Sequence, residues 1–447
     1  MKSYFLRRLL LIPPTLIGIT LLVFTITRFV PGGPMDRMLQ TAARGADQGG
    51  KKASTNQSQG GLNEEQLEEL EEIYGLDKTI LVAYGQWLGI APREARISKG
   101  EYGDRGDEMI GSEIDPETTA LVVLRGDGRA VLVKRKGAAV ESAVFQETGK
   151  PVESEGWKVR YETEQDRQAR YQRRNTGKEN PPAYRPRAVI YQTRFSGILQ
   201  GDLGRSQIYN EPVDKMILGR IPVAAYFGLL TAIITYAVCL PLGVLKALKH
   251  RTFIDTSSSV LIFLGYSIPG FALGAILLVH LGARMNLFPL FGLTSPDFDQ
   301  MNDWAKVKDI AHHTVLPLIC YMVGSFAMLT MLTKNSLMDN LAADYVRTAM
   351  AKGVSFPRAV FGHAFRNSMI PIATSLGSLV EIFIGGSMLI ETVFDIQGFG
   401  LLQYHSVLER DVPVIMGTLT IAAFLMLLGQ VISDFMVAVV DPRIKFE

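Results

Sequence analysis

Cysteine is scarce in this chain, with only two residues among 447. Cys239 and Cys320 both lie inside apolar stretches, where a free thiol behaves as a small packing residue. The polar stretch over residues 31–222 has no cysteine. A disulfide framework is therefore excluded for that stretch.

Motifs of the common catalytic sites are also missing. A phosphate-binding loop needs G-x-x-x-x-G-K-[ST], because its backbone amides surround the phosphates. Gly149-Lys150 and Gly177-Lys178 lack both the leading glycine and the final Ser or Thr. There is no H-E-x-x-H, nucleophile elbow or Cys-x-x-Cys. We expect no ATP hydrolysis by this chain alone, no catalytic residue, no bound cofactor and no metal. The adjacent His312 and His313 point apart on a helix and suit polar anchoring at an interface.

Charge of one sign is not in excess, since the formal net charge is +2, and no nucleic-acid partner is expected. Apolar sequence is abundant, at 47% of residues. It gathers in about six runs of roughly 20 residues, the length that crosses a bilayer. We predict spans at Leu9–Val30, Val223–Leu245, Val260–Leu281, Val315–Leu332, Met369–Ile390 and Val414–Val440. The first run is interpreted as a retained span, because it is long, contains Pro13-Pro14 and has no small-x-small cleavage pattern.

The short loops predict the orientation of these spans. Lysine and arginine gather in cytoplasmic loops of membrane proteins. With six spans, the basic residues of the short loops fall on one side, so both termini are expected in the cytoplasm. These residues are Lys2, Arg7, Arg8, Lys246, Lys249, Arg251, Lys334, Arg347, Lys352, Arg358, Arg366, Arg443 and Lys445. The long segment Pro31–Pro222 lies outside, where the charge rule does not govern long domains.

The outer segment divides into parts of different composition. Asn63–Trp87 has helical spacing, broken at Tyr74–Asp77, and Gly45–Gly61 is a polar loop. A small β-containing insert is expected over residues 92–193. Its predicted strands are Thr118–Leu124 and Arg129–Lys134, which flank the hairpin signal Gly126-Asp127-Gly128, and then Trp157–Tyr161 and Ala188–Gln192. Gln165–Asn180 is highly charged and is predicted to be a flexible polar arm.

The segment from Asp344 to Pro371 is a charged, helix-forming loop between two apolar runs. We predict a short helix that ends at Gly353, with Asp344 near its positive end and Lys352 near its negative end. A second helix begins after Ser355 as N-cap, with Pro357 in its first turn. Such a helix–glycine–helix loop on the cytoplasmic side suits docking into a cleft of another protein.

This segment resembles the EAA loop of ABC importer permeases, whose short helix sits on the ATPase subunit. The pattern DYV-TA-AKG, then HAFRN, then IP is similar to the peptide-permease version. Further similar motifs are 31–36, 201–206, 391–394, 398–400, 410–413 and 441–443. Leu329–Ser336 and Val440–Ile444 look particularly like the Yej-type permease, an oligopeptide and microcin C importer. The resemblance covers residues 1–90 and 195–447 and leaves out the insert. Ala224-Ala225 also departs from the usual Ala-Thr.

The resemblance implies an all-α polytopic protein of the type I ABC importer permease fold, with a periplasmic α+β insertion. Residues 1–30 would form the first span, 31–222 the periplasmic region, and 223–447 the core with a coupling loop at 334–368. It implies a bacterial inner-membrane subunit that imports peptides by alternating access. Partners would be a second homologous permease, ABC ATPase subunits that bind ATP-Mg, a periplasmic peptide-binding protein and membrane lipid.

The resemblance also assigns roles to particular residues. The residues expected to couple to the ATPase are Asp344, Tyr345, Arg347, Thr348, Ala349, Lys352 and Gly353. Those expected at the periplasmic gate or docking surface are Glu391, Phe394, Gly398 and Asp411.

Polar residues and prolines inside the runs suggest a translocation path. Glu381 is a mid-span acid that either lines the pore or is protonated or hydrogen-bonded at a helix interface. Pro241, Pro269 and Pro317 are expected to kink their spans. The path is predicted to include Tyr266, Ser267, Pro269, Phe271 and Glu381. Asp434, near the end of the last run, is expected to pair with a nearby base.

Two other classes of function compete with an ATP-driven importer. An ion-coupled secondary transporter should show inverted repeats and paired intramembrane charges. A membrane receptor with a ligand-binding insert would make the docking loop unnecessary. About six spans, few buried charges and the docking loop favour the importer, which co-purification with an ATPase would test.

Overall fold

The computed structural model describes residues 2–29, 68, 71–72, 75, 77–103, 118–174, 183–385 and 387–440, without the side chains of 2–3, 173–174, 376–385 and 440. The chain divides into two compact units. One consists of Met1–Arg37 and Leu203–Glu447, and the other is Met38–Asp202. We call the first the membrane unit and the second the outer unit.

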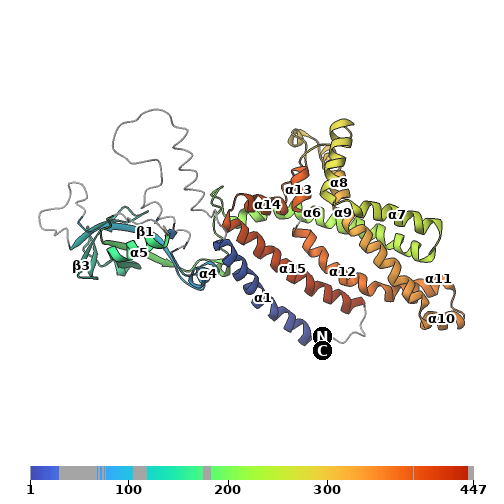
Figure 1. The fold of residues 1–447 in the computed structure, drawn as a ribbon, viewed down its shortest axis with the longest axis horizontal. Coiled ribbons are helices and arrows are strands. Elements are labelled where there is room, and N and C mark those ends of the chain that lie inside the picture. The colour runs from blue at the N-terminus through green and yellow to red at the C-terminus, as the bar shows by residue number, and fades with distance from the viewer. Residues whose placement is uncertain are drawn as a thin grey trace. The chain divides into compact units, whose positions relative to one another are not determined.

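Four predicted spans are long apolar helices of the membrane unit (Figure 1). They are α1 (Lys2–Phe29), α6 (Val213–Leu248), α9 (Asp303–Ala342) and α15 (Val412–Val440). Pro241 and Pro317 lie inside α6 and α9, which run on past them. α12 (Phe365–Gly385) covers most of the run Met369–Ile390 and packs beside α15, which also contacts α1.

The run Val260–Leu281 is not one straight span. It is divided between α7 (Phe253–Ser267) and α8 (Gly270–Leu277), which continues into the π-helix η3 (Leu278–Arg284). The two parts are bent by 91°. The described residues therefore hold four candidate spans, or five if the bent pair counts as one. The kink expected at Pro269 is a full break, because Pro269 is the N-cap of α8.

Shorter elements complete the membrane unit. They are η4 (Phe298–Gln300), α10 (Asp344–Ala351), α11 (Phe356–Ala359), the π-helix η5 (Val360–Ala364), α13 (Met388–Phe394) and α14 (Phe399–Leu408). In Figure 1, α10 and α11 lie at one end of the helix bundle, and α13 and α14 lie at the other.

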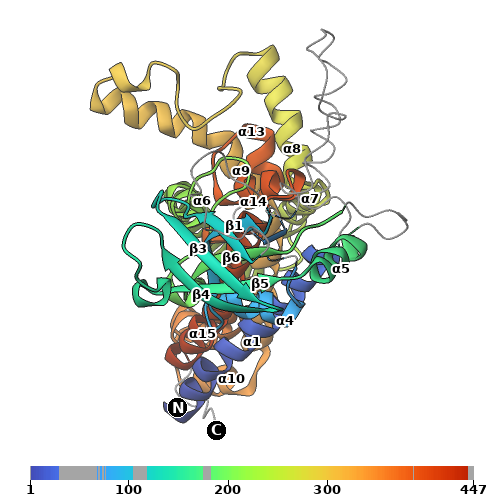
Figure 2. The same ribbon diagram turned by 90° about the vertical axis from the view of Figure 1, so that its left-hand side faces the viewer.

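The outer unit holds two three-stranded antiparallel sheets, ordered β1-β6-β5 and β2-β3-β4 (Figure 2). Their strands are β1 (Arg93–Glu101), β2 (Thr119–Val123), β3 (Ala130–Lys136), β4 (Ala139–Phe145), β5 (Trp157–Glu162) and β6 (Arg187–Arg194). Both sheets contribute to one apolar core, which includes Val122, Val133, Phe145, Trp157 and Ile190. The four predicted strands and the hairpin at Gly126-Asp127-Gly128 are confirmed. β1 and β4 were not predicted.

The remaining outer elements are α4 (Ile80–Leu88), α5 (Glu164–Arg174), η1 (Val152–Glu155) and η2 (Ile198–Gln200). The predicted helix Asn63–Trp87 is helical at the described residues 68, 71 and 72 and in α4. Its break is confirmed at Gly75, which has a φ of 59°. The polar loop Gly45–Gly61 lies outside the described residues.

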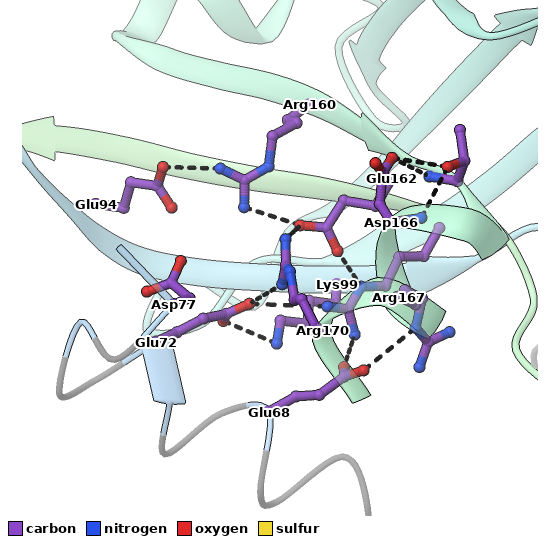
Figure 3. A network of polar contacts seen from close by, with 12 residues as sticks. Glu68, Glu72, Asp77, Glu94, Lys99, Arg160, Glu162, Asp166, Arg167 and Arg170 are labelled. Carbon is purple, nitrogen blue, oxygen red and sulfur yellow. Dashed lines mark hydrogen bonds and ion pairs between the residues drawn. The ribbon is translucent and has the colours of Figure 1, made fainter. Parts of the chain in front are cut away.

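The flexible arm predicted at Gln165–Asn180 is wrong for residues 165–174, which belong to α5. The reason is a network of ion pairs (Figure 3). Arg170 donates to Glu162 at 2.6 Å and to Glu72 at 3.3 Å. Arg187, on β6, donates to Glu162 at 2.7 Å and also to Glu68. Charges that suggest a solvated arm in the sequence are thus held in a largely buried network.

Candidate functional site

The predicted docking helix exists as α10. Asp344 is its first residue, and Gly353 follows directly after its C-cap, Lys352. The N–H of Val354 donates to the carbonyl of Ala349 at 3.1 Å, and that of Gly353 donates to Met350 at 2.9 Å. These two bonds form a Schellman motif, which requires a left-handed residue after the C-cap. Gly353 supplies it with a φ of 90°.

One apolar side chain anchors α10 to the rest of the membrane unit. Val346 is buried in a cluster with Val244 and Ala247 of α6, Leu337 of α9, and Ala359 and Ala364 of the following helices. The hydroxyl of Tyr345 also donates to Asn340 Oδ1 at 2.6 Å. The helix is therefore fixed from one side only.

The other predicted coupling residues of α10 face outward. Asp344, Tyr345, Arg347, Thr348 and Lys352 are exposed, and Ala349 is half-buried. Beyond them, Met350, Phe356 and Phe361 expose large apolar side chains. A loop that exposes both charged and large apolar side chains is suited to packing against another protein.

The second loop helix begins as predicted. Ser355 is the N-cap of α11, with Pro357 in the first turn, although the Ser355 side chain makes no capping bond. The chain then passes through η5 into α12 without a loop.

The residues predicted to line the path lie at the break between α7 and α8. Tyr266 and Ser267 end α7, Pro269 caps α8 and Phe271 lies in its first turn. All four side chains are exposed in the isolated chain. Glu381 belongs to α12, and the structure describes its backbone but not its side chain.

The predicted outer gate residues are all buried. Glu391 is 1% exposed, and its carboxylate accepts from the N–H of Leu401 at 2.7 Å and the hydroxyl of Tyr321 at 3.2 Å. A Cβ on Gly398 would lie 2.5 Å from that carboxylate. Phe394 packs in the adjacent apolar core. Glu391 thus joins α13 to the first turn of α14, as a capping group supplied by another helix.

Asp411 is buried as well and holds the segment before α6. Its carboxylate accepts from the hydroxyl of Ser206, and from the N–H of Gln207 at 3.2 Å. Glu391, Phe394, Gly398 and Asp411 were expected at the periplasmic gate or docking surface, and all four are buried in this chain. They hold together the loops around α13 and α14, while their exposed neighbours Thr392, Asp395 and Gln397 form the surface.

Residues 239–446 match the family described as "Binding-protein-dependent transport system inner membrane component". The chain is 32% identical to the "Peptidoglycan transport system permease protein YejB" of Agrobacterium fabrum, over 100% of this chain and 99% of that protein. The chain belongs to this permease family. It is therefore a multi-pass inner-membrane protein and a non-catalytic subunit of an ABC importer, with the type I permease fold.

Two further relatives match only part of this permease. It is 40% identical to the "Inner membrane ABC transporter permease protein YejB" of Escherichia coli O157:H7, over 55% of this chain and 68% of that protein. It is 35% identical to the "Oligopeptide transport system permease protein AppB" of Bacillus subtilis, over 58% and 81%. The Agrobacterium alignment spans the insert as well. The expectation that the resemblance stops at the insert is thus wrong for that relative.

Among the other charged residues of the permease, Asp434 lies as predicted and two lysines do not. Asp434 pairs with Arg8 of α1 at 2.7 Å, as predicted. Lys246 and Lys334 were expected at the cytoplasmic surface, yet both are buried around Asp255. The sequence signal was available, because both lysines lie within apolar helices. Among the described residues, no group of His, Cys, Asp or Glu is arranged to hold a metal ion.

Proposed function

We propose that this permease imports oligopeptides or peptide-like compounds across the inner membrane. The proposal rests on the names of its relatives, which include permeases of oligopeptide and peptidoglycan transport systems. The substrate path would pass the exposed break at Tyr266–Phe271 and would include Glu381 on α12. The 91° bend there frees backbone groups, a feature of transporter helices that line a cavity.

The coupling helix α10 is the proposed docking element for an ABC ATPase subunit, which would bind ATP-Mg in place of this chain. The single observation that carries this step is the anchoring of α10 through the buried Val346 and the Tyr345–Asn340 hydrogen bond, with its charged residues exposed. Such an anchor lets the helix move together with a bound partner protein. The movement of the helix would then be transmitted to α6 and α9.

A second, homologous permease would complete the pore as a heterodimer, because many large apolar side chains of α7 and α8 are exposed in this chain. Both termini would lie in the cytoplasm with α10, and α13 and α14 would face the periplasm. The periplasmic region would be residues 31–222, where a peptide-binding protein docks. ATP binding would draw the docking helices together and open the pore outward.

Replacement of Gly353 tests the coupling assignment. The φ of 90° at this position costs a β-branched residue about 1–2 kcal/mol and disfavours the Schellman turn. Gly353→Val should insert normally but bind the ATPase subunit weakly, which co-purification measures. Gly353→Asn is the matched control, because asparagine tolerates this conformation. Equal ATPase binding by Gly353→Val and the parent chain would contradict the assignment.

A further inference from the structure

Three buried charged residues lie beneath the coupling loop. Lys246 ends α6, Asp255 begins α7 and Lys334 lies on α9; their exposed fractions are 0%, 5% and 8%. Lys334 Nζ donates to both carboxylate oxygens of Asp255, at 2.7 and 2.8 Å. Lys246 Nζ lies 3.2 Å from the same carboxylate. We call these three residues the charged cluster.

The cluster is fully hydrogen-bonded around the turn between α6 and α7. Lys246 Nζ also donates to the carbonyl of Asp255 and to the hydroxyls of Ser258 and Ser259, at 2.7–2.8 Å. The Asp255 carboxylate accepts from the N–H of Arg251 at 3.1 Å. Arg251 has a φ of 60°, so this bond holds a strained residue in the turn. A satisfied buried network of this kind fixes one geometry.

The helix turns that carry the two lysines also receive the coupling helix. Val244 and Ala247 flank Lys246 on α6, and Leu337 lies one turn beyond Lys334 on α9. These three side chains belong to the same buried apolar cluster as Val346 of α10. α6 and α9 are themselves in close contact here, since a Cβ on Gly243 would lie 2.6 Å from Thr333 Cβ. The same paired turns therefore share an apolar cluster with α10 and carry the charged groups that contact α7.

α7 leads from the cluster to the break at Tyr266–Phe271. It is a continuous helix of 15 residues, so a displacement of its first turn is carried to its last. Figure 1 shows the turn between α6 and α7 at the same end of the bundle as α10 and α11. A push on α10 has a physical route to the proposed path through these contacts.

We propose that the charged cluster is the joint that makes α7 move as one body with the coupling ends of α6 and α9. Lys334 is then a positioning residue for transport, acting through Asp255. The proposal rests on the proposed docking of an ATPase at α10. Without the Lys334–Asp255 contact, α6 and α9 follow the ATPase while α7 lags behind.

Lys334→Met is the informative variant, because it leaves Lys246 and Asp255 as a neutral pair. Lys334→Arg restores the charge, and Lys249→Met removes an exposed lysine of the same turn as a control. The buried Cys239 and Cys320 are changed to alanine throughout, and spin labels are placed at the exposed positions Thr256 and Asp339. The label distance is measured in the whole importer, without nucleotide and trapped with ATP and vanadate.

In the parent and in both control variants, trapping should leave the distance unchanged, because α7 and α9 move together. In Lys334→Met, trapping should shift it by about 5 Å, one helical turn. ATPase binding and the nucleotide-free distance should stay normal. An unchanged distance in Lys334→Met, or an equal broadening in both states, overturns the proposal.

A second substitution covers the case in which Lys334→Met does not assemble. Lys334→Gln also removes the ion pair with Asp255 but leaves a shorter polar side chain in place of an apolar one, and the proposal fails if this variant also does not assemble or shows no shift. Failure of the proposed function is distinguished separately. It is indicated if Gly353→Val binds the ATPase normally, whatever the label distances show.

Discussion

At the scale of single residues, the outer loop shows why glycine stands at two nearby positions. A Cβ on Gly398 would lie 2.5 Å from the Glu391 carboxylate, and one on Gly400 would lie 2.8 Å from the backbone nitrogen of Met388. The carboxylate needs this space to reach the N–H of Leu401. The Gly-Phe-Gly motif therefore serves a buried acid that lies seven residues before it.

We predict that Gly398→Ala displaces the carboxylate and destabilises the junction of α13 and α14. The expected loss is about 1–3 kcal/mol, the usual cost of a buried acceptor that loses its partner. Thermal unfolding in detergent should show a lower midpoint for Gly398→Ala. Gly219→Ala, in α6 with nothing within 4 Å of its Cβ, should be neutral or stabilising. Equal midpoints for the two variants would contradict this reading.

At the scale of elements, α5 shows how opposite charges can order a segment. Burial opposes ionisation of Glu162, but Arg187, Arg170 and Arg160 outweigh it and lower the pKa to about 2. Burial raises the pKa of Glu71 to about 7, with Arg170 opposing and nearby acids adding to the effect. The contributions of Glu162 and Glu71 to the stability of the outer unit therefore change with pH in opposite directions.

The expected result is a stability maximum of the outer unit near pH 4.5. Glu162 has a lowered folded-state pKa, so its contribution is present above 4.5 and is lost as the pH falls toward 2. Glu71 has a raised folded-state pKa, so its contribution is present below pH 4.5 and is lost as the pH rises through 7. This pH profile has two limbs, the rise below pH 4.5 and the fall above it. Each limb corresponds to a change on the order of 3 kcal/mol in the free energy of unfolding.

Tryptophan fluorescence can measure both limbs in a Trp304→Phe background, where Trp87 and Trp157 of the outer unit remain. Denaturant midpoints are recorded between pH 2 and 8. Glu71→Gln should flatten the limb above 4.5, and Glu162→Gln should flatten the limb below it. A variant that keeps the slope of its limb would show that another group titrates there.

At the scale of the whole molecule, the outer unit and the membrane unit have separate cores. We predict that replacing Pro92–Thr193 with a Gly/Ser linker preserves membrane insertion, pairing with the second permease and ATPase binding. The deletion removes Lys99, Arg167, Arg170 and Arg187, which are ion-pair partners of Glu68 and Glu72. A second version of the shortened chain should carry Glu68→Gln and Glu72→Gln, because the deletion leaves these two acids without those partners.

The measurement is co-purification of the ATPase and the second permease with the shortened chain. Uptake should weaken through poorer engagement of the binding protein. The chain with the deletion alone is the control that keeps Glu68 and Glu72 without their ion-pair partners. It should be recovered in lower yield than the chain that also carries the two Gln substitutions. Loss of the assembled complex in both chains would show that the insert is part of the membrane unit's structure.

Much of this fold could be predicted because its signals are local. A run of roughly 20 apolar residues is sufficient for a membrane helix. Four such runs, the α10 helix with Gly353 and the hairpin at Gly126-Asp127-Gly128 were found in this way. β1 was missed because only Ser98 of its nine residues is buried, and its pairing with β6 defines it as a strand.

The sequence by itself determined that this chain is a membrane permease with a short charged helix that begins at Asp344 and a β-containing insert. Only the tertiary structure decided which charges are buried. Glu68 meets Arg187 across 119 positions of the chain, and Asp255 meets Lys334 across 79. The physical reason is that helix and turn propensities depend on adjacent residues. A charge can be buried only where folding brings its partner, and local pattern does not indicate that partner.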